Sequence, residues 1–161
     1  MMINKEENSD ELISLLNDLI RINRDRSAGY QKAIGQLGPT DIDLKTMFVN
    51  MANHSAEFSE ELSKQVVNLG GEPASDSSRS GEIYRAWMDF HAGMTEHDRK
   101  SIISRCEFGE DAALRAYQSA VAAKVILPAA VSQIIDDQHA NIRAAHDVVK
   151  RYRDMHEAIE H

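Results

Sequence analysis

Carboxylate and imidazole side chains interrupt the apolar stripes of this sequence at helical spacing. Glu57 and Glu60 stand three residues apart, and Glu110 lies on an apolar stripe. His146 follows Arg143 by three residues on a later stripe. Carboxylates and imidazoles bind iron and manganese, and helical bundles hold such metals between facing helices. The candidate metal ligands are therefore Glu57, Glu60, Glu110 and His146.

These polar positions form an approximate internal repeat. Asn23 precedes Tyr30 by seven residues in the first half of the chain. Glu110 precedes Tyr117 by the same interval in the second half. The pair Glu57-x-x-Glu60 follows Asn23 later in the first half. The pair Arg143-x-x-His146 follows Glu110 at a similar sequence distance in the second half.

An arginine in this pattern suggests a site without metal. Arginine stays protonated and cannot ligate a metal ion. Arg143 can instead form a bidentate pair with Glu110 or Glu57, charge for charge where a cation would otherwise sit. Asn23 and Arg26 also lie near the apolar seam of their helix. Because buried charges need partners, we favour an internal polar network over a metal site, with Asn23, Tyr30, Tyr117 and Arg143 as its members.

A second register of metal-binding residues stays open. Asp136 and His139 stand one helical turn apart, and Glu107 could lie near them. Such a set could form a partial mononuclear site for a divalent metal. The simpler interpretation is a solvated helix face. Matching positions in the first half are Asp18, Met51 and His54.

The elements that must position these residues are helices. Apolar residues recur every three or four positions in four long stretches, and nothing alternates with the period of a strand. Asn8 with Glu11 resembles a capping box for the first helix, and Thr40 is placed to cap the second. Gly70 is suited to close the second helix in a left-handed conformation.

The order of these helices predicts the fold class. Two antiparallel helix pairs joined by a long crossover, at about residues 70–95, form an all-α, ferritin-like four-helix bundle. A short amphipathic helix is expected inside the crossover. Trp87, Tyr84, Phe90 and Met94 there could cap the bundle or form an apolar patch for a second subunit. We expect residues 1–161 to form a single domain.

The repeat resembles the ferritins, bacterioferritins and rubrerythrins. Further short pieces run through most of the chain, including Leu16-Asn17-Asp18-Leu19-Ile20, Gly29-Tyr30, Leu69-Gly70-Gly71-Glu72-Pro73, Arg85-Ala86-Trp87, Gly109-Glu110-Asp111 and His146-Asp147. In these pieces the chain more closely resembles an uncharacterised bacterial family of ferritin-like proteins. The resemblance implies a di-iron bundle, but Asn23 stands where a ligand glutamate is implied, Glu60 replaces a histidine, and Arg143 replaces a glutamate.

Composition narrows the partners and the compartment. A formal charge of -8 repels phosphate backbones and anionic lipid, so we expect neither nucleic acid nor a membrane as a partner. Cys106 is the only cysteine, which favours a reducing compartment and a cytoplasmic location. A homodimer is the partner we consider.

Two functions follow from these observations. The favoured one is a non-enzymatic scaffold or stress-related binding protein with no cofactor. The alternative is a redox or storage-type protein that binds iron or manganese with a reduced ligand set.

Overall fold

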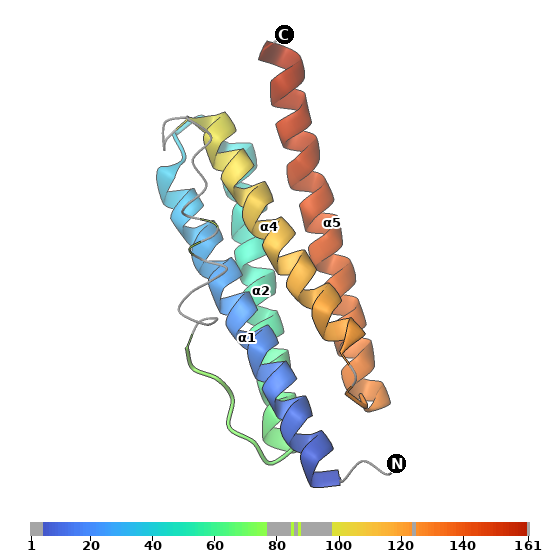
Figure 1. Cartoon of the computed structure of the whole chain (residues 1–161). Coiled ribbons are helices and arrows are strands. Elements are labelled where there is room, and N and C mark those ends of the chain that lie inside the picture. The colour runs from blue at the N-terminus through green and yellow to red at the C-terminus, as the bar shows by residue number, and fades with distance from the viewer. Residues whose placement is uncertain (1–4, 77–84, 86, 88–97, 124, 161) are drawn as a thin grey trace.

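The computed structural model describes residues 5–76, 85, 87, 98–123 and 125–160. Within these residues the chain forms four long helices and no strand, so the all-helical prediction is confirmed. No helix of this described part combines the length and the apolar character that a membrane span requires. The helices, labelled in Figure 1, are α1 (Lys5–Gln36), α2 (Ile42–Asn68), α4 (Arg99–Ala122) and α5 (Ala129–Glu160).

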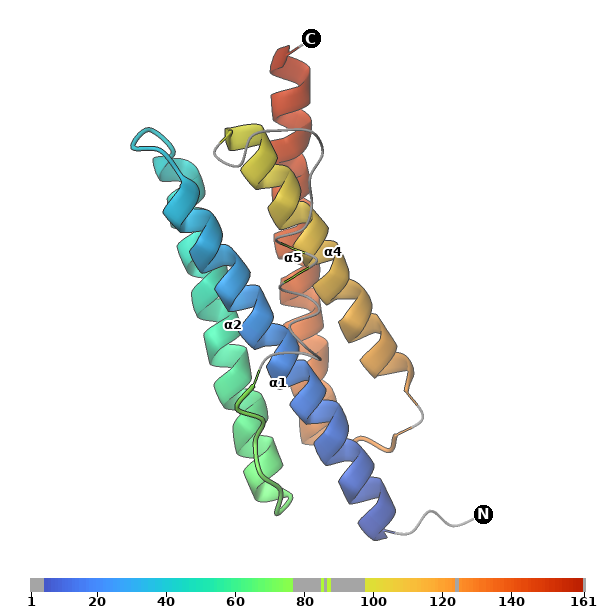
Figure 2. The same ribbon diagram turned by 60° about the vertical axis from the view of Figure 1, so that its left-hand side comes forward.

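The four helices pack as two antiparallel pairs. Figures 1 and 2 show α1 beside α2 and α4 beside α5, with the members of each pair running in opposite directions. Helices α2 and α4 run in the same direction, so the chain crosses the length of the bundle between them (Figure 1). This confirms the predicted bundle topology. The short helix predicted within the crossover lies almost wholly outside the described residues.

The buried side of each helix follows the predicted three- and four-residue period. Leu16, Leu62, Ile102 and Ile142 come from the four different helices, and all are fully buried. Burial of one such side chain stabilises the fold by about 1.5–3 kcal/mol, so these apolar seams fix the rotation of each helix. The seam of α2 includes Leu44, Phe48, Met51, Ser55, Leu62 and Val66. That of α5 includes Val131, Ile135, Gln138, Ile142, Ala145 and Val149.

The helix ends depart from two sequence predictions. Helix α1 begins at Lys5, and Asn8 does not cap it. The Asn8 side chain instead bonds the backbone N–H and C=O of Ile126, at 3.1 and 3.2 Å, because the loop before α5 ends beside the start of α1. The N-cap of α2 is Asp41 and not Thr40. At the other end of α2, Gly70 has a φ of 84°, as the sequence predicts.

Trp87 from the crossover fills a gap between α1 and α4. The side chain is fully buried, and its indole packs edge-on to Tyr30 with the ring centroids 4.8 Å apart. A Cβ atom at Gly29 would lie 2.6 Å from the indole, and one at Gly109 only 1.9 Å from it. Glycine at these two positions therefore lets the indole reach both helix backbones. The crossover was expected either to cap the bundle or to form an apolar patch, and Trp87 packs onto the bundle. Tyr84, Phe90 and Met94 lie outside the described residues.

Candidate functional site

An ion pair lies at the centre of the bundle, between α1 and α4. Arg26 and Glu110 are both fully buried. Nη2 of Arg26 lies 2.7 Å from Oε1 of Glu110, and Nε of Arg26 lies 2.9 and 3.1 Å from the two carboxylate oxygens. The hydroxyl of Tyr30, one turn after Arg26 on α1, donates to Oε1 of the same carboxylate. Both carboxylate oxygens of Glu110 thus accept hydrogen bonds from side chains of α1.

The remaining side of the guanidinium is held by α2. Nη1 of Arg26 donates to Oγ of Ser55 at 2.6 Å and to the backbone oxygen of Met51 at 3.3 Å. Its Cζ also lies 5.4 Å from the centre of the Tyr30 ring, in cation–π range. Burial lowers the pKa of Arg26, but the Glu110 carboxylate together with Tyr30 and Tyr117 raises that pKa above its ordinary value. The cation is therefore permanent.

A second chain of hydrogen bonds joins all four helices. Nδ2 of Asn23 on α1 donates to the Tyr117 hydroxyl on α4 at 2.7 Å, and that hydroxyl donates to Oε1 of Gln138 on α5 at 2.7 Å. Nε2 of Gln138 then donates to Oε1 of Glu61 on α2 at 2.9 Å. Burial raises the pKa of Tyr117, so the phenol stays neutral and can serve as both donor and acceptor.

The structure brings together some of the predicted residues and separates others. Asn23, Tyr30, Glu110 and Tyr117 meet in the interior. Arg143, predicted as the partner of Glu110, is instead exposed on α5, and Arg26 takes its place. The reason is helix rotation: Ile142 occupies the buried seam, and its neighbour points about 100° away.

The same rotation places Glu57 and Glu60 outside. Ser55 and Leu62 lie on the buried seam of α2, which leaves both glutamates exposed. The four proposed metal ligands therefore do not form one group within the described residues, where a different set of three side chains comes together. Ser55 and Gln138 are two interior polar residues that the sequence did not single out. Each lies at a position of the apolar stripe of its helix, and that position was the only sign of burial in the sequence. A serine or a glutamine at such a position is easily overlooked, because neither side chain is charged.

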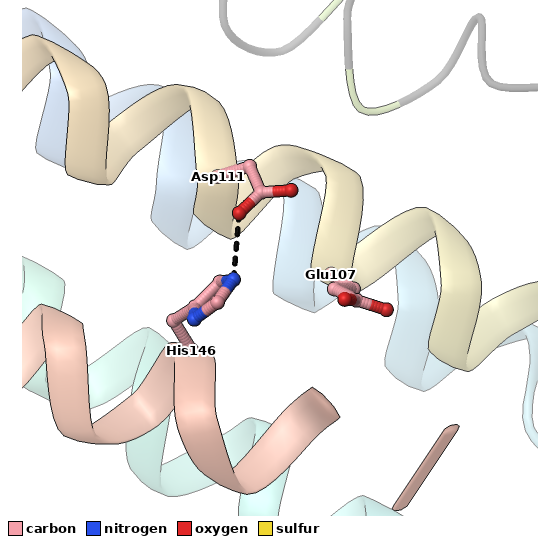
Figure 3. Close-up of side chains that lie close together, drawn as sticks. All are labelled: Glu107, Asp111 and His146. Carbon is pink, nitrogen blue, oxygen red and sulfur yellow. Dashed lines mark ion pairs between the residues drawn. The ribbon is translucent and has the colours of Figure 1, made fainter. Parts of the chain in front are cut away.

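His146 belongs to a separate cluster between α4 and α5. Its Nε2 lies 2.6 Å from Oδ1 of Asp111, and Figure 3 shows Glu107 one turn away on the same helix as Asp111. Ligand atoms of Glu107, Asp111 and His146 all lie within 4.8 Å of one another. We call these three residues the α4–α5 cluster.

The second register of metal-binding residues does not assemble around Glu107. His139 stacks on Tyr117 with ring centroids 6.4 Å apart, and Asp136 is exposed. In the first half, His54 stacks on Phe58 at 6.3 Å, and Asp18 pairs with Arg21 at 3.1 Å. Neither half of this register forms a group of three metal-binding side chains in the described part of the chain.

Comparison with solved structures defines the class of fold. A Dps1 variant from Mycobacterium smegmatis is similar with a TM-score of 0.79 at 10% identity, over 93% of this chain and 99% of that one. A dodecameric thioferritin from Bacteroides fragilis gives 0.75 at 15% identity, over 94% and 89%. A ferritin-like diiron-carboxylate protein from Bacillus anthracis gives 0.59 at 13%, over 98% and 99%. The fold is that of ferritin-like bundles.

The family follows from the sequence. A family described as Domain of unknown function (DUF2383) matches residues 11–123, most of the chain, and the protein belongs to that family. No curated protein gives a significant match. The family description carries no activity, so function must be argued from the residues.

The ferritin-like fold implies a di-metal centre, and the central residues here do not fit one. Such centres take one glutamate from each of two helices and Glu-x-x-His from each of the other two. The resemblance implies that Asn23 and Arg143 stand at two of the glutamate positions and Glu60 at a histidine position. In the structure Arg143 and Glu60 are exposed. Glu110 is present, but the guanidinium of Arg26 occupies the space a metal ion would need beside it.

Proposed function

We propose that this protein is a non-enzymatic ferritin-like bundle, acting as a scaffold or stress-related binding protein. The observation that carries the proposal is the fully buried pair of Arg26 and Glu110. In it, a cation built into the chain neutralises the carboxylate at the centre of the bundle. The bundle then needs no cofactor to neutralise its central carboxylate.

Electrostatics supports this proposal. Two unit charges 4 Å apart interact by about 4 kcal/mol at an effective dielectric constant near 20, so a divalent ion beside the guanidinium would be opposed by about 8 kcal/mol. Glu110 gives such an ion only one carboxylate, whose two oxygens already accept bonds from Arg26. A metal ion would therefore have to expel the guanidinium from a fully buried site.

The most direct partner for such a scaffold is a second copy of the chain. We propose a homodimer in the cytoplasm as the working unit. Self-association is supported by the dodecameric state named for the similar thioferritin. Light scattering of the purified protein measures this state directly.

The absence of di-iron chemistry can be tested with ferrous iron and oxygen. The full-length His146→Asn variant is used, so that the α4–α5 cluster does not contribute to the signal. We expect ferrous iron to oxidise at the rate of the buffer control. Saturable, oxygen-dependent oxidation at two irons per chain, lost in His146→Asn/Glu110→Gln, would overturn the proposal.

A further inference from the structure

We propose that Glu107, Asp111 and His146 form a mononuclear site for a divalent transition-metal ion. This site lies between α4 and α5 and is separate from the central ion pair. It adds a binding activity to the scaffold and uses none of the residues that neutralise Glu110.

The two helices place the three side chains on one spot. Glu107 and Asp111 stand four residues apart on α4, so their carboxylates project from the same side of that helix. His146 reaches the spot from α5, and Figure 3 shows its imidazole turned toward Asp111. Because the ligand atoms lie within 4.8 Å of one another, small side-chain movements would let one ion touch all three.

The distances suit a metal ion after a small opening of the cluster. Metal–nitrogen and metal–oxygen bonds near 2.1 Å place two ligand atoms about 3–3.5 Å apart at ordinary coordination angles. Nε2 of His146 and Oδ1 of Asp111 are 2.6 Å apart. They need to separate by less than about 1 Å, which side-chain rotation supplies without moving either helix.

A neighbouring carboxylate orients the imidazole. Oδ1 of Asp147 lies 3.2 Å from Nδ1 of His146. With a metal ion bound, a bond to Asp147 would keep the proton on Nδ1 and leave the lone pair of Nε2 for the ion. Histidines that bind metals in proteins characteristically have a carboxylate or carbonyl on the second nitrogen. The arrangement around His146 has this form.

Burial and charge favour a cation at the same place. The side chains of Glu107 and His146 are 10% and 16% exposed, whereas that of Asp111 is 44% exposed. The spot is therefore shielded by the helices but open to water at Asp111, and water can complete the coordination shell.

Arg153 is a built-in competitor for the ion. Its Nη1 donates to Oε1 of Glu107 at 2.8 Å. The same guanidinium also lies 3.0 Å from Asp154 and 3.9 Å from Glu157, so it keeps carboxylate partners if it leaves Glu107. Removal of this competitor should strengthen metal binding, whereas removal of a ligand should weaken it. A simple ion pair between His146 and Asp111 predicts neither change.

The donor set indicates the class of metal. Two carboxylates with one imidazole suit manganese, iron and zinc ions, whereas magnesium and calcium take oxygen ligands alone. Zinc is the practical probe, since it has no redox chemistry. Cobalt, which takes similar sites, reports its ligands through its visible absorption.

Calorimetric titration of the chelator-treated full-length protein with zinc tests the site. We expect one zinc ion per chain, with affinity reduced at least tenfold in His146→Asn and in Asp111→Asn. Arg153→Gln should bind several-fold more tightly. His139→Asn is the matched control, because His139 lies two turns earlier on the same helix and belongs to the other register; its affinity should be unchanged.

Three results would overturn the site: no stoichiometric zinc binding, binding that survives His146→Asn, or binding lost in His139→Asn. Circular dichroism establishes that each variant is folded, and the partial exposure of Asp111 makes Asp111→Asn the safest variant in this respect. The cobalt absorption band should disappear in His146→Asn and remain in His139→Asn. Failure of this site leaves the proposal for Arg26 and Glu110 intact, since none of these variants touches that pair.

Discussion

Arg26 on α1 and Glu110 on α4 lie 2.7 Å apart with neither side chain exposed to solvent. Burial of two charges is costly, and an intact pair contributes little net stability compared with a well-packed apolar core. Removal of one partner is different, because the remaining charge is then buried alone. The pair thus makes the interior of the bundle intolerant of change at either position.

A double-mutant cycle measures this dependence. Arg26→Met and Glu110→Gln should each lower the free energy of unfolding by about 3–5 kcal/mol, and the double variant should lose clearly less than their sum. Chemical denaturation gives the three values. The matched control is Arg21→Ala, which breaks pairs with the exposed carboxylates of Asp18 and Asp76 and should cost about 0–1 kcal/mol. Additive losses at positions 26 and 110 would contradict the coupling.

Gly109→Ala tests the position of Trp87. The added Cβ would meet the indole at 1.9 Å, so the ring must move, and we expect a loss of about 1–3 kcal/mol. Trp87 is the only tryptophan in the chain, so its fluorescence emission should shift to the red. Gly35→Ala is the control: its Cβ meets nothing within 4 Å, and alanine should stabilise α1 by up to about 1 kcal/mol. An unshifted emission in Gly109→Ala would contradict this packing.

Stability should fall in alkali. Burial raises the pKa of Tyr30 well above its ordinary value of 10.0, with a further contribution from Glu110, and burial also raises that of Tyr117. The folded state then binds more protons than the unfolded state above about pH 10, so the free energy of unfolding decreases as pH rises past that value.

Denaturation midpoints between pH 8 and 11.5 check this expectation. Burial raises the pKa of Cys106 too, so its contribution has the same sign and begins near its ordinary value of 9.0. Phenolate absorbance from the two buried tyrosines should appear together with unfolding and not before it. A Tyr30→Phe/Tyr117→Phe variant should lose less stability between these pH values than the parent protein. Ionisation of both tyrosines in the folded state would show that the phenols are not shielded.

Metal should stabilise the fold if the α4–α5 cluster binds it. A ligand that binds only the folded state stabilises it. When its concentration is one hundred times the dissociation constant, the free energy of unfolding rises by about 2.7 kcal/mol. Zinc should therefore raise the melting temperature, and a chelator should reverse the change. The effect should be absent in His146→Asn and present in His139→Asn. An equal shift in both variants would place the zinc elsewhere.

Much of the architecture could be predicted from the sequence. The three- and four-residue period of leucines and isoleucines gave the four helices, and the long polar interval after Gly71 gave the crossover. Asn23, Tyr30, Glu110 and Tyr117 were recognised as interior candidates because they interrupt apolar stripes. Periodicity is a local property of one helix, so it can be read without knowledge of the partner helices.

Neighbouring positions on one helix were harder to assign. The edge of an apolar stripe does not show which of two adjacent residues faces inward, and one position corresponds to about 100° of rotation. Arg143 was therefore assigned to the centre, although packing of Ile142 turns it outward. Glu60 was misplaced for the same reason. The cluster of Glu107, Asp111 and His146 depends on a contact between two helices. Asp111 and His146 are 35 residues apart in the sequence, so no local pattern joins them.

The sequence by itself determined that this chain is a four-helix bundle with charged residues on its apolar stripes, because helix formation and amphipathicity follow from local spacing. Only the tertiary structure decided which charges meet. Arg26 and not Arg143 reaches Glu110, and His146 joins Asp111, because the rotation of each helix is set by the combined packing of all four apolar seams.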